Sequence, residues 1–573
     1  MSKAAQPPPW LADESIADAQ AVASALQELA HLVAATDSTS HRARAYERAA
    51  GTVRSLGYSL EAVARDGRLL GVPGIGKSIA GVILELMTTG HAKTLDDLRA
   101  LFGPGMRELG GIAGLTPIRI QTLYRELGVA TVSALRAACE AQAIRTLHGF
   151  GAKTELKLLA SLTAASDDGG KNMLLVHARD ISERLRAHAV GCPGVCRAEV
   201  VGDVRRWQET VSSIDILATV RDLQHVAGVF AAFERAPDVL RCEPGGANML
   251  QLHLPDRFVA NLWVVHDGQH GFSMVHLTGS SAHVARLELP AEPWLDCDEA
   301  SIYQRVGLPY IPPELREDQG EIEAARAGDT FADLVTRDDV RGMVHCHTTY
   351  SDGKASIGQM ATAAERMGMQ YITITDHSPA AHYAGGLAGE SLSKQWRDIA
   401  EAQSERTIAI LRGTESDILR DGQLDYPLET LQQMDVVIAS VHGRMKMDSD
   451  AMTARLISAM QQPCFKIWGH ALGRLLLHRP AFACDVERIL HAASESRAAI
   501  EINGDPHRMD LEPGWARRAR KMGLQFVIST DAHSVRQLNN IQFGVGLARR
   551  AGLRHQDVLN TLSVEAFKAA VKP

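Results

Sequence analysis

Seven short β-rich runs, separated by helix-like stretches, follow one another from about residue 337 to the C-terminus. They are MVHCH (343–347), YITITDH (371–377), TIAILRG (407–413), VVIASVH (436–442), FKIWGH (465–470), AAIEING (498–504) and FVISTDAH (526–533). Regular alternation of strand and helix is typical of a parallel sheet with crossover helices. Seven such units predict a (β/α)7-type barrel over 337–573.

Polar side chains stand at the C-terminal ends of these runs, on the face where such barrels place their active sites. His345 and His347 are two residues apart, so their imidazoles face the same side of a strand, and Asp531 and His533 repeat this spacing. The candidate metal ligands are His345, His347, Asp352, His377, Glu415, His442, His470, Asp531 and His533. A lone histidine in an apolar strand is more often a hydrogen-bonded core residue, but nine such residues favour metal binding.

Imidazole and carboxylate ligands together suit Zn²⁺, Mn²⁺ or Fe²⁺ and leave the identity of the metal open. Nine ligands are too many for one ion, so we expect two or three divalent ions, with Mn²⁺ or Zn²⁺ favoured, and a bridging carboxylate. Clusters of this kind lower the pKa of bound water and hold both oxygens of an in-line phosphoryl displacement. The sequence therefore predicts hydrolysis of phosphate esters.

Length and composition limit the remaining possibilities. A chain of 573 residues exceeds what one hydrophobic core usually supports, so several domains are expected. Of the eight cysteines only Cys192 and Cys196 are close, which predicts free thiols and no structural zinc site. The chain has no membrane-helix run and no signal-peptide pattern, which predicts a cytoplasmic protein. A net charge of -8 gives no global basic signature, so nucleic acid would have to be bound locally.

The first 160 residues read as helices, with glycine-containing turns between helix pairs at 69–86, 109–124 and 147–159. These are candidate helix-hairpin-helix units, in which N–H groups at the start of a helix hold a DNA phosphate without a basic patch. The candidate DNA-binding residues are Gly74, Gly76, Lys77, Gly149, Gly151 and Lys153. A plain αα-hairpin with glycine caps is the alternative, and the second unit, with Thr116-Pro117, is the weaker match.

Between the helical part and the barrel, from about 172 to 270, strand-like runs such as SSIDILATV (212–220) are interleaved with helix-like stretches such as LQHVAGVFAAFERA (223–236). This pattern predicts an α+β domain. A polar, charged connector, PPELREDQGEIEAARAG (312–328), then leads to the barrel.

The barrel resembles the PHP (polymerase and histidinol phosphatase) domain, because HCHTTYSDG (345–353) is similar to the opening motif of that family. The resemblance implies three metal sites, held by His345, His347, Glu415 and Asp531, by Glu415, His442 and His470, and by Asp352, His377 and His533. It implies catalytic roles for His345, His347, Glu415, Asp531 and Arg474, and contacts of Asn503 and Arg508 with substrate phosphate. For Arg474 a structural ion pair is an equal alternative.

Helix-hairpin-helix units upstream of a PHP domain, and the connector GLPYIPPELREDQGEIEAA (307–325), make the whole chain similar to the bacterial family X DNA polymerases. The resemblance implies a DNA-end-binding domain over 1–95, a fingers-like domain over 96–170, a nucleotidyltransferase-like palm over 171–270, a thumb over 271–320, a linker over 321–336 and the PHP domain over 337–573. It also implies sequence-independent binding of DNA ends, gaps or single strands, and a role in DNA repair.

The palm departs from the family pattern, in which GS-x-RR precedes D-x-D and a third Asp, and three carboxylates hold two Mg²⁺ ions. Asp203 replaces the serine that bonds nucleotide phosphate, Ser213 and Asn261 replace two metal carboxylates, and only Asp215 remains. Neutral oxygens bind a hard dication weakly, and Asp203 repels a triphosphate. We therefore expect the palm to have lost Mg²⁺ binding and nucleotidyl transfer, with Arg205 and Arg206 in phosphate contacts or structural ion pairs.

The leading hypothesis is a DNA-binding, metal-dependent 3′–5′ exonuclease or related DNA-end phosphoesterase without polymerase activity. An active repair polymerase with an attached exonuclease, a histidinol-phosphatase-like enzyme for small molecules, and a non-enzymatic DNA scaffold are the alternatives. The hairpin units favour DNA over a small substrate. The complete ligand set argues against a scaffold.

Overall fold

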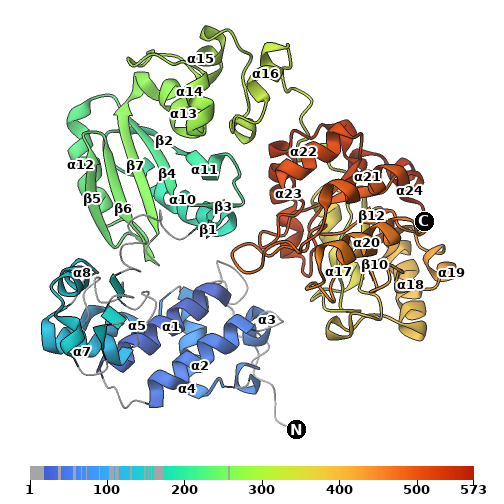
Figure 1. Cartoon of the computed structure of the whole chain (residues 1–573), viewed down its shortest axis with the longest axis horizontal. Coiled ribbons are helices and arrows are strands. Elements are labelled where there is room, and N and C mark those ends of the chain that lie inside the picture. The colour runs from blue at the N-terminus through green and yellow to red at the C-terminus, as the bar shows by residue number, and fades with distance from the viewer. Residues whose placement is uncertain are drawn as a thin grey trace. The chain divides into compact units, whose positions relative to one another are not determined.

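The structure is a computed structural model of the chain. It describes residues 19–36, 41–55, 60–65, 68–72, 74–89, 91–101, 109, 115, 117–129, 132–147, 150–152, 154–155, 158–159, 172–255 and 258–573. The chain divides into two compact units, 1–171 with 253–258, and 172–252 with 259–573, and each is described by itself (Figure 1). No helix among the described residues is long and apolar enough to cross a membrane.

The first unit is helical, as predicted. Its helices are α1 (Ala19–Thr36), α2 (His41–Ser55), α3 (Leu60–Arg65), α4 (Lys77–Thr89), α5 (Lys93–Leu101), α7 (Pro117–Leu127) and α8 (Val132–Glu140). Leu26 and Leu29 of α1 and Ile83 of α4 are fully buried in one core, whereas Leu123 and Leu135 belong to a second core. The separate cores agree with two successive helical domains.

The second unit begins with a five-stranded mixed sheet, the predicted α+β palm. Its strands, in spatial order, are β2 (Val195–Val201), β4 (Ile214–Val220), β7 (Val259–His266), β6 (Met249–His253) and β5 (Arg241–Gly246). Helices α10 (Leu175–Val190) and α12 (Val226–Phe233) accompany the sheet, and β1 (Met173–Leu174) pairs with β3 (Thr210–Val211) beside it. Strands β4 and β7 are parallel, with Asp215 opposite Asn261.

Four short helices follow the palm sheet: α13 (His270–Thr278), α14 (Ser281–Arg286), α15 (Glu299–Arg305) and α16 (Glu321–Arg326). Residues of α13, α15 and α16, together with Leu287 just after α14, form one hydrophobic core, in which Ile302 and Tyr303 are fully buried. The predicted linker, 321–336, contributes α16, and its residues Ile322 and Phe331 are buried in the same core. This stretch therefore packs with the thumb helices.

The C-terminal part is a seven-stranded parallel sheet that nearly closes into the predicted (β/α)7-type barrel. Its strands, in both chain and spatial order, are β8 (Gly342–Met343), β9 (Tyr371–Ile374), β10 (Ala409–Asp417), β11 (Val436–Ser440), β12 (Ile467–Trp468), β13 (Ala499–Asn503) and β14 (Phe526–Ser529). A parallel bridge between Cys346 and Ala532 joins the residues that follow the first and last strands.

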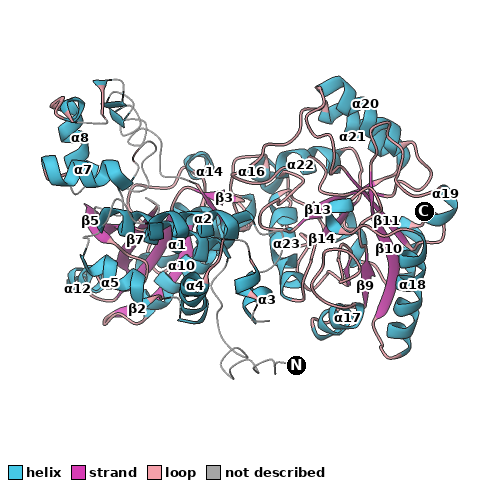
Figure 2. Ribbon diagram, turned by 90° about the horizontal axis from the view of Figure 1, so that it is seen from below, coloured by secondary structure: helices cyan, strands magenta, loops and turns pink. Residues whose placement is uncertain are grey.

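Helices cover the outside of the barrel strands in Figure 2. They are α17 (Ile357–Arg366), α18 (Gly389–Ser404), α19 (Leu428–Leu431), α20 (Ser449–Met460), α21 (Val486–Ser496), α22 (Pro513–Lys521), α23 (Ile541–Arg550) and α24 (Val564–Val571). Every residue of β9, β11, β13 and β14 is buried, as expected for parallel strands covered on both faces. Because the strands are parallel, their C-terminal ends meet at one rim.

Candidate metal centre

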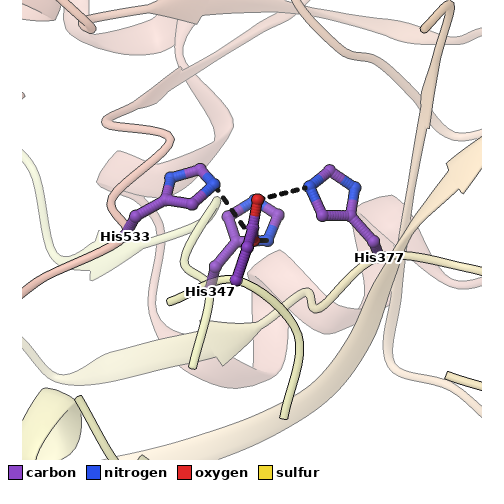
Figure 3. Close-up of side chains that lie close together, drawn as sticks. His347, His377 and His533 are labelled. Carbon is purple, nitrogen blue, oxygen red and sulfur yellow. Dashed lines mark ion pairs between the residues drawn. The ribbon is translucent and has the colours of Figure 1, made fainter. Parts of the chain in front are cut away.

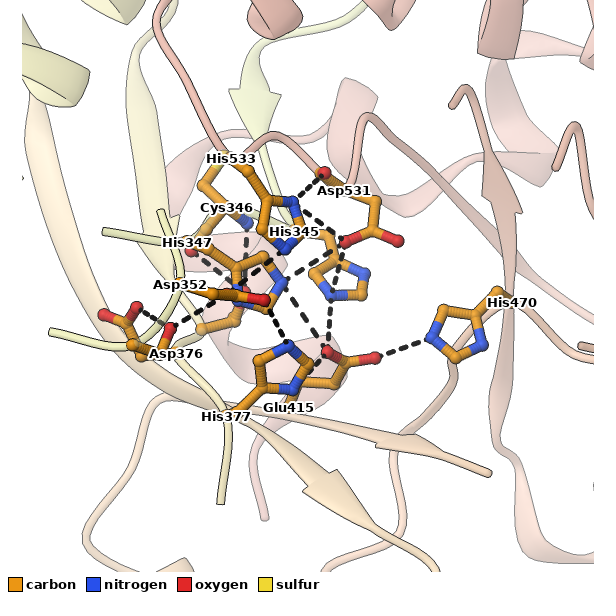
Figure 4. Close-up of polar contacts among 12 residues, drawn as sticks. His345, Cys346, His347, Asp352, Asp376, His377, Glu415, His470, Asp531 and His533 are labelled. Carbon is orange, nitrogen blue, oxygen red and sulfur yellow. Dashed lines mark hydrogen bonds and ion pairs between the residues drawn. The ribbon is translucent and has the colours of Figure 1, made fainter. Parts of the chain in front are cut away.

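Glu415, near the end of β10, lies at the middle of the rim and is 1% exposed. Its two oxygens face the ring nitrogens of five histidines. Oε1 lies 3.2 Å from His442 Nε2 and 2.7 Å from His470 Nε2. Oε2 lies 3.4 Å from His345 Nε2, 3.6 Å from His347 Nε2 and 3.0 Å from His377 Nδ1. Figure 4 shows this carboxylate among the rings. Glu415 is therefore placed to bridge metal ions.

Three groups of side chains place their ligand atoms within 4.8 Å of one another: His345, His347, Glu415 and Asp531; His347, Asp352, His377 and His533; and His377, Glu415 and His442. Figure 3 shows the rings of His347, His377 and His533 close together. The oxygens of Asp352 lie 3.6 Å from His377 Nε2 and 3.3 Å from His533 Nε2. The nine candidate ligands thus lie at one centre.

The second and third groups differ in membership from the sets implied by the PHP resemblance. His347 joins Asp352 and His533, and His377 takes the place of His470 beside Glu415. A neutral imidazole offers one lone pair, so each shared histidine serves one ion at a time. His470 is absent from the third group, but its Nε2 lies 2.7 Å from Glu415 Oε1, closer than His442 Nε2 at 3.2 Å. His470 is therefore also positioned to share an ion with Glu415, as the PHP resemblance implies.

The donor atoms fit divalent metal ions. His345 Nε2, His347 Nε2, His377 Nδ1 and Glu415 Oε2 are buried and have no hydrogen-bond partner, although each points into the centre. A buried polar atom without a partner costs free energy, and a cation at these points removes that cost. Mixed imidazole and carboxylate donors suit borderline divalent ions such as Zn²⁺ and Mn²⁺.

The electrostatics of the centre favour ionised carboxylates beside a neutral imidazole. Burial alone would raise the pKa of Glu415, but His442, His345 and His377 outweigh it and hold that pKa well below its ordinary value. Burial, reinforced by His533 and His377, lowers the pKa of His347 to about 3. Metal ligands must be deprotonated, and Glu415 and His347 are already in that form. Glu415 outweighs burial and raises the pKa of His377 to about 10 and that of His442 to about 9, so a metal ion would have to displace a proton from each of these two rings.

Two carboxylates that the sequence analysis did not single out orient the histidine ligands. Glu501 Oε1 lies 2.5 Å from His345 Nδ1, and Asp417 Oδ2 lies 3.3 Å from His442 Nδ1. A carboxylate at Nδ1 holds the proton there and leaves Nε2 free for a metal. The sequence signal was an acidic residue near the end of a strand: Glu501 lies two residues before Asn503 in AAIEING, and Asp417 lies two residues after Glu415 in AILRGTESD.

Asp376, next to the ligand His377, holds a loop. It accepts hydrogen bonds from the backbone and hydroxyl of Thr348, at 2.7 and 2.6 Å, and from Gln395 Nε2 at 2.6 Å. These bonds fix the turn between the first ligands and Asp352. Cys346 is fully buried, and all eight cysteines are free, as predicted.

Three further residues implied by the PHP resemblance lie near the rim: Asn503 at the end of β13, Arg508 in the loop after β13, and Arg474 in the loop after β12. Arg508 Nε lies 3.4 Å from Asp531 Oδ2, and its buried Nη1 has no hydrogen-bond partner. Asn503 Nδ2 lies 3.4 Å from the same oxygen of Asp531. Arg474 instead pairs with Glu209 and Glu512, at 3.2 and 3.1 Å, which is the arrangement of the structural alternative.

The palm carboxylate Asp215 is engaged by neutral donors. Asn261 Nδ2 donates to Oδ1 at 2.9 Å, Trp263 Nε1 donates to the same oxygen at 3.3 Å, and the Ser213 hydroxyl donates to Oδ2 at 3.0 Å. The positions that carry metal carboxylates in the related pattern therefore act here as hydrogen-bond donors to the remaining carboxylate.

The palm arginines are also engaged. Arg206 is 7% exposed and pairs with Asp203 and with Glu317, the latter at 2.7 Å. Arg205 pairs with Glu299, which also accepts from Arg316. These contacts correspond to the structural ion pairs left open by the sequence.

The first hairpin exposes the predicted phosphate-binding turn. Gly74, Gly76 and Lys77 are exposed at the start of α4, and Gly74 has a φ of +84°, which glycine adopts without strain. In the third hairpin Gly151 is exposed and its carbonyl accepts from Thr154 N at 2.8 Å. Gly149 and Lys153, like Thr116 of the second hairpin, lie outside the described residues.

Three models of known families match separate parts of the chain. A helix-hairpin-helix domain model matches residues 17–92, a SAM-like helix-hairpin-helix tandem matches 106–164, and the PHP domain matches 344–504. Proteins named probable phosphatase from Thermoanaerobacter sp. (strain X514) and Vibrio parahaemolyticus are 31% and 26% identical over 235 and 232 residues, covering 38% of this chain and 89% and 88% of their own length.

A relative that spans nearly the whole chain decides the family. It is the DNA polymerase/3′-5′ exonuclease PolX of Bacillus subtilis (strain 168), which is 31% identical over 529 residues, or 88% of this chain and 91% of its own length. The match runs through the helical, palm and barrel regions together. The chain therefore belongs to the bacterial family X DNA polymerases that carry a C-terminal PHP domain.

Proposed function

We propose that this chain is a metal-dependent 3′–5′ exonuclease that binds DNA and acts in DNA repair, and that its palm no longer catalyses nucleotidyl transfer. The observation that carries the proposal is the gathering of eight other candidate imidazole and carboxylate ligands around Glu415, with buried ligand atoms that make no hydrogen bond. The Bacillus subtilis relative is named a DNA polymerase/3′-5′ exonuclease, and this supports the choice of DNA ends as substrate.

The side chains at the centre have different roles in the proposed hydrolysis. Glu415 and Asp531 hold negative charge at the centre, while Glu501 keeps the Nδ1 proton of His345 in place. When bound, divalent ions supply a nucleophile from water at neutral pH and neutralise the developing phosphate charge. Arg508, whose Nη1 is buried and unpartnered beside Asp531, is placed to bind a non-bridging oxygen of the scissile phosphate.

The helical unit is proposed to hold the DNA backbone. The exposed turn at Gly74 and Gly76 leaves the first N–H groups of α4 open to a phosphate, and Lys77 adds a positive charge. Contacts of this kind read no base sequence, and the affinity they give falls with salt concentration.

Loss of polymerisation is supported by the hydrogen bonds of Asp215. Three neutral donors already surround its carboxylate, and Ser213 and Asn261 bring no charge to hold Mg²⁺. An active polymerase remains the second candidate, because the Bacillus subtilis relative is named for both activities. The third candidate is a small-molecule phosphatase, because the relatives that match the barrel alone are named probable phosphatases.

One preparation tests the three candidates. Full-length protein with Mn²⁺ is given a 3′-labelled oligonucleotide, a primed template with nucleotides, and a sugar or amino-alcohol phosphate. We expect release of labelled mononucleotide, no template-dependent extension, and slow turnover of the small ester. A His345→Ala variant should lose nearly all hydrolysis. If that variant kept full activity, the nuclease would not lie at this centre.

A further inference from the structure

Tyr383 is the most exposed large apolar side chain among the described residues, with 73% of its surface in solvent. It lies beside the metal centre: its ring centroid is 6.2 Å from that of His377 and 6.4 Å from that of His442. The rings are inclined by 57° and 67°, so neither histidine stacks on the tyrosine. The ring of Tyr383 therefore lies next to two candidate ligands of the centre, and neither of them stacks on its flat face.

The loop that carries Tyr383 is held on both sides. Ala380 N donates to Asp425 Oδ2 at 2.6 Å before it, and Leu387 N donates to His377 O at 2.8 Å after it. A Cβ atom at Gly386 would lie only 1.9 Å from the carbonyl oxygen of Ser378, so the loop packs closely against the strand end. The ring is thus presented by a fixed backbone, which lowers the entropic cost of binding.

An ordinary surface tyrosine is the alternative explanation. One feature argues against it. The ring borders the place where the phosphate of the proposed substrate would lie, because His377 and His442, the two rings beside it, both face Glu415. Of the groups joined to a nucleotide phosphate, the nucleobase has a planar face that stacks on an aromatic ring, whatever its sequence.

We propose that Tyr383 is a specificity-determining residue that stacks on a nucleobase adjoining the scissile phosphate. The inference rests on the proposed exonuclease function and deepens it, because it explains how the centre distinguishes a DNA end from a small phosphate ester. A sugar or amino-alcohol phosphate offers no planar ring and gains nothing from this contact. The ring touches the base and not the reacting atoms, so it acts on substrate binding.

Kinetics on three oligonucleotides test the proposal with the full-length, Mn²⁺-loaded protein. One has natural bases, one has an abasic residue at the 3′ terminus, and one has it at the penultimate position. Tyr383 stacks on one base, so only the oligonucleotide that lacks that base should bind less well. Wild-type protein should show a KM about tenfold lower for the natural end than for that abasic end. Tyr383→Ala should raise the KM for the natural end to that abasic value, with kcat little changed.

Two further variants separate stacking from other effects. Tyr383→Phe should behave as the wild type, whereas Tyr383→Leu, which keeps apolar bulk without a ring, should behave as Tyr383→Ala. Leu428→Ala, at the exposed first residue of α19, is the surface control and should leave KM unchanged. Thermal unfolding checks that each variant is folded.

The outcomes are distinct. If Tyr383→Ala keeps the wild-type preference for a natural base, or the wild type has no such preference, the stacking role is wrong and the exonuclease function stands. If the wild type hydrolyses no DNA end but turns over the small ester, both proposals are overturned.

Discussion

Oε1 of the palm residue Glu209 lies 3.2 Å from Nη2 of the barrel residue Arg474, and the other oxygen of Glu209 pairs with Arg550 at the end of α23. Arg474 also donates to the main-chain carbonyls of Arg508 and Met509. The palm thus contacts, through one arginine, the loop that brings Arg508 to the metal centre. Even without nucleotidyl transfer, the palm would help to keep the barrel's loop in place.

Replacing Glu209 by Gln should destabilise the palm–barrel contact. Glu209 and Arg474 are largely buried, with side-chain exposures of 14% and 10%. The change removes the carboxylate that Arg550 faces and one of the two carboxylates that Arg474 faces, since Glu512 stays beside Arg474. Removing one partner of a buried ion pair costs about 3–5 kcal/mol. Urea unfolding followed by near-UV circular dichroism measures the loss. Glu183→Gln, which breaks an exposed pair with Arg186, is the matched control and should cost less than about 1 kcal/mol.

The same carboxylate should give stability a dependence on acid pH. Burial would raise the pKa of Glu209, but Arg550 and Arg474, the charged groups that face it, outweigh burial and lower the pKa from its ordinary value of 4.5. A lowered folded-state pKa contributes stability above the unfolded-state pKa, and this stability is lost as pH falls through the folded value. The gap in unfolding free energy between wild type and Glu209→Gln should be constant from about pH 6 to 8 and narrow below about 4.5. A gap that widened in acid would contradict this assignment.

The barrel and the grouping of its candidate ligands were predictable because their signals are local. Six of the seven strand-like runs have a candidate ligand, a histidine or carboxylate, at or just after their C-terminal end, and the i,i+2 spacing of His345 and His347 already places both rings on one face. The order of the strands follows the chain order, so parallel neighbours need no further information. The ligands therefore meet wherever the strand ends meet.

Contacts between distant segments were not predictable in this way. Glu501 bonds to His345 across 156 residues, and Glu209 bonds to Arg474 across 265. No local pattern marks the partner of a buried charge, because any of many acidic residues would satisfy the same arginine or histidine. For this reason the sequence did not distinguish a catalytic role of Arg474 from a structural ion pair. The fold shows that Glu209 and Glu512 face it.

Glu501→Gln should weaken metal binding although Glu501 is itself no candidate ligand. The amide keeps the size of the side chain but loses the charge that holds the Nδ1 proton of His345, and it also perturbs the bonds from Ser529 and Asn503. Loss of such a partner typically costs 10–100-fold in metal affinity or activity. Titration of metal-free protein with Mn²⁺ measures the affinity.

His491→Gln provides the matched control for that titration. His491 is an exposed histidine of α21 that pairs only with Glu487 on its own helix, so its replacement should leave Mn²⁺ affinity unchanged. Equal affinities for Glu501→Gln and wild type would show that the Glu501 carboxylate does not tune the ligand.

Restoring two carboxylates should make the stability of the palm depend on Mg²⁺. In the double variant Ser213→Asp with Asn261→Asp, Asp215 loses the donor side chains of both residues and gains two negative neighbours. Without Mg²⁺ the variant should be less stable than the wild type, since like charges repel at short distance. At a Mg²⁺ concentration about 100 times the dissociation constant it should regain about 2.7 kcal/mol of unfolding free energy.

Thermal unfolding with and without Mg²⁺ measures both effects. The neutral double variant Ser213→Asn with Asn261→Ser is the control, because any stabilisation that Mg²⁺ gives by binding to the barrel is the same in both variants. If the carboxylate variant gained no more from Mg²⁺ than the neutral one, substitution at these two positions would not explain the loss of a palm metal site, and the case against an active polymerase would have to rest on primer extension alone.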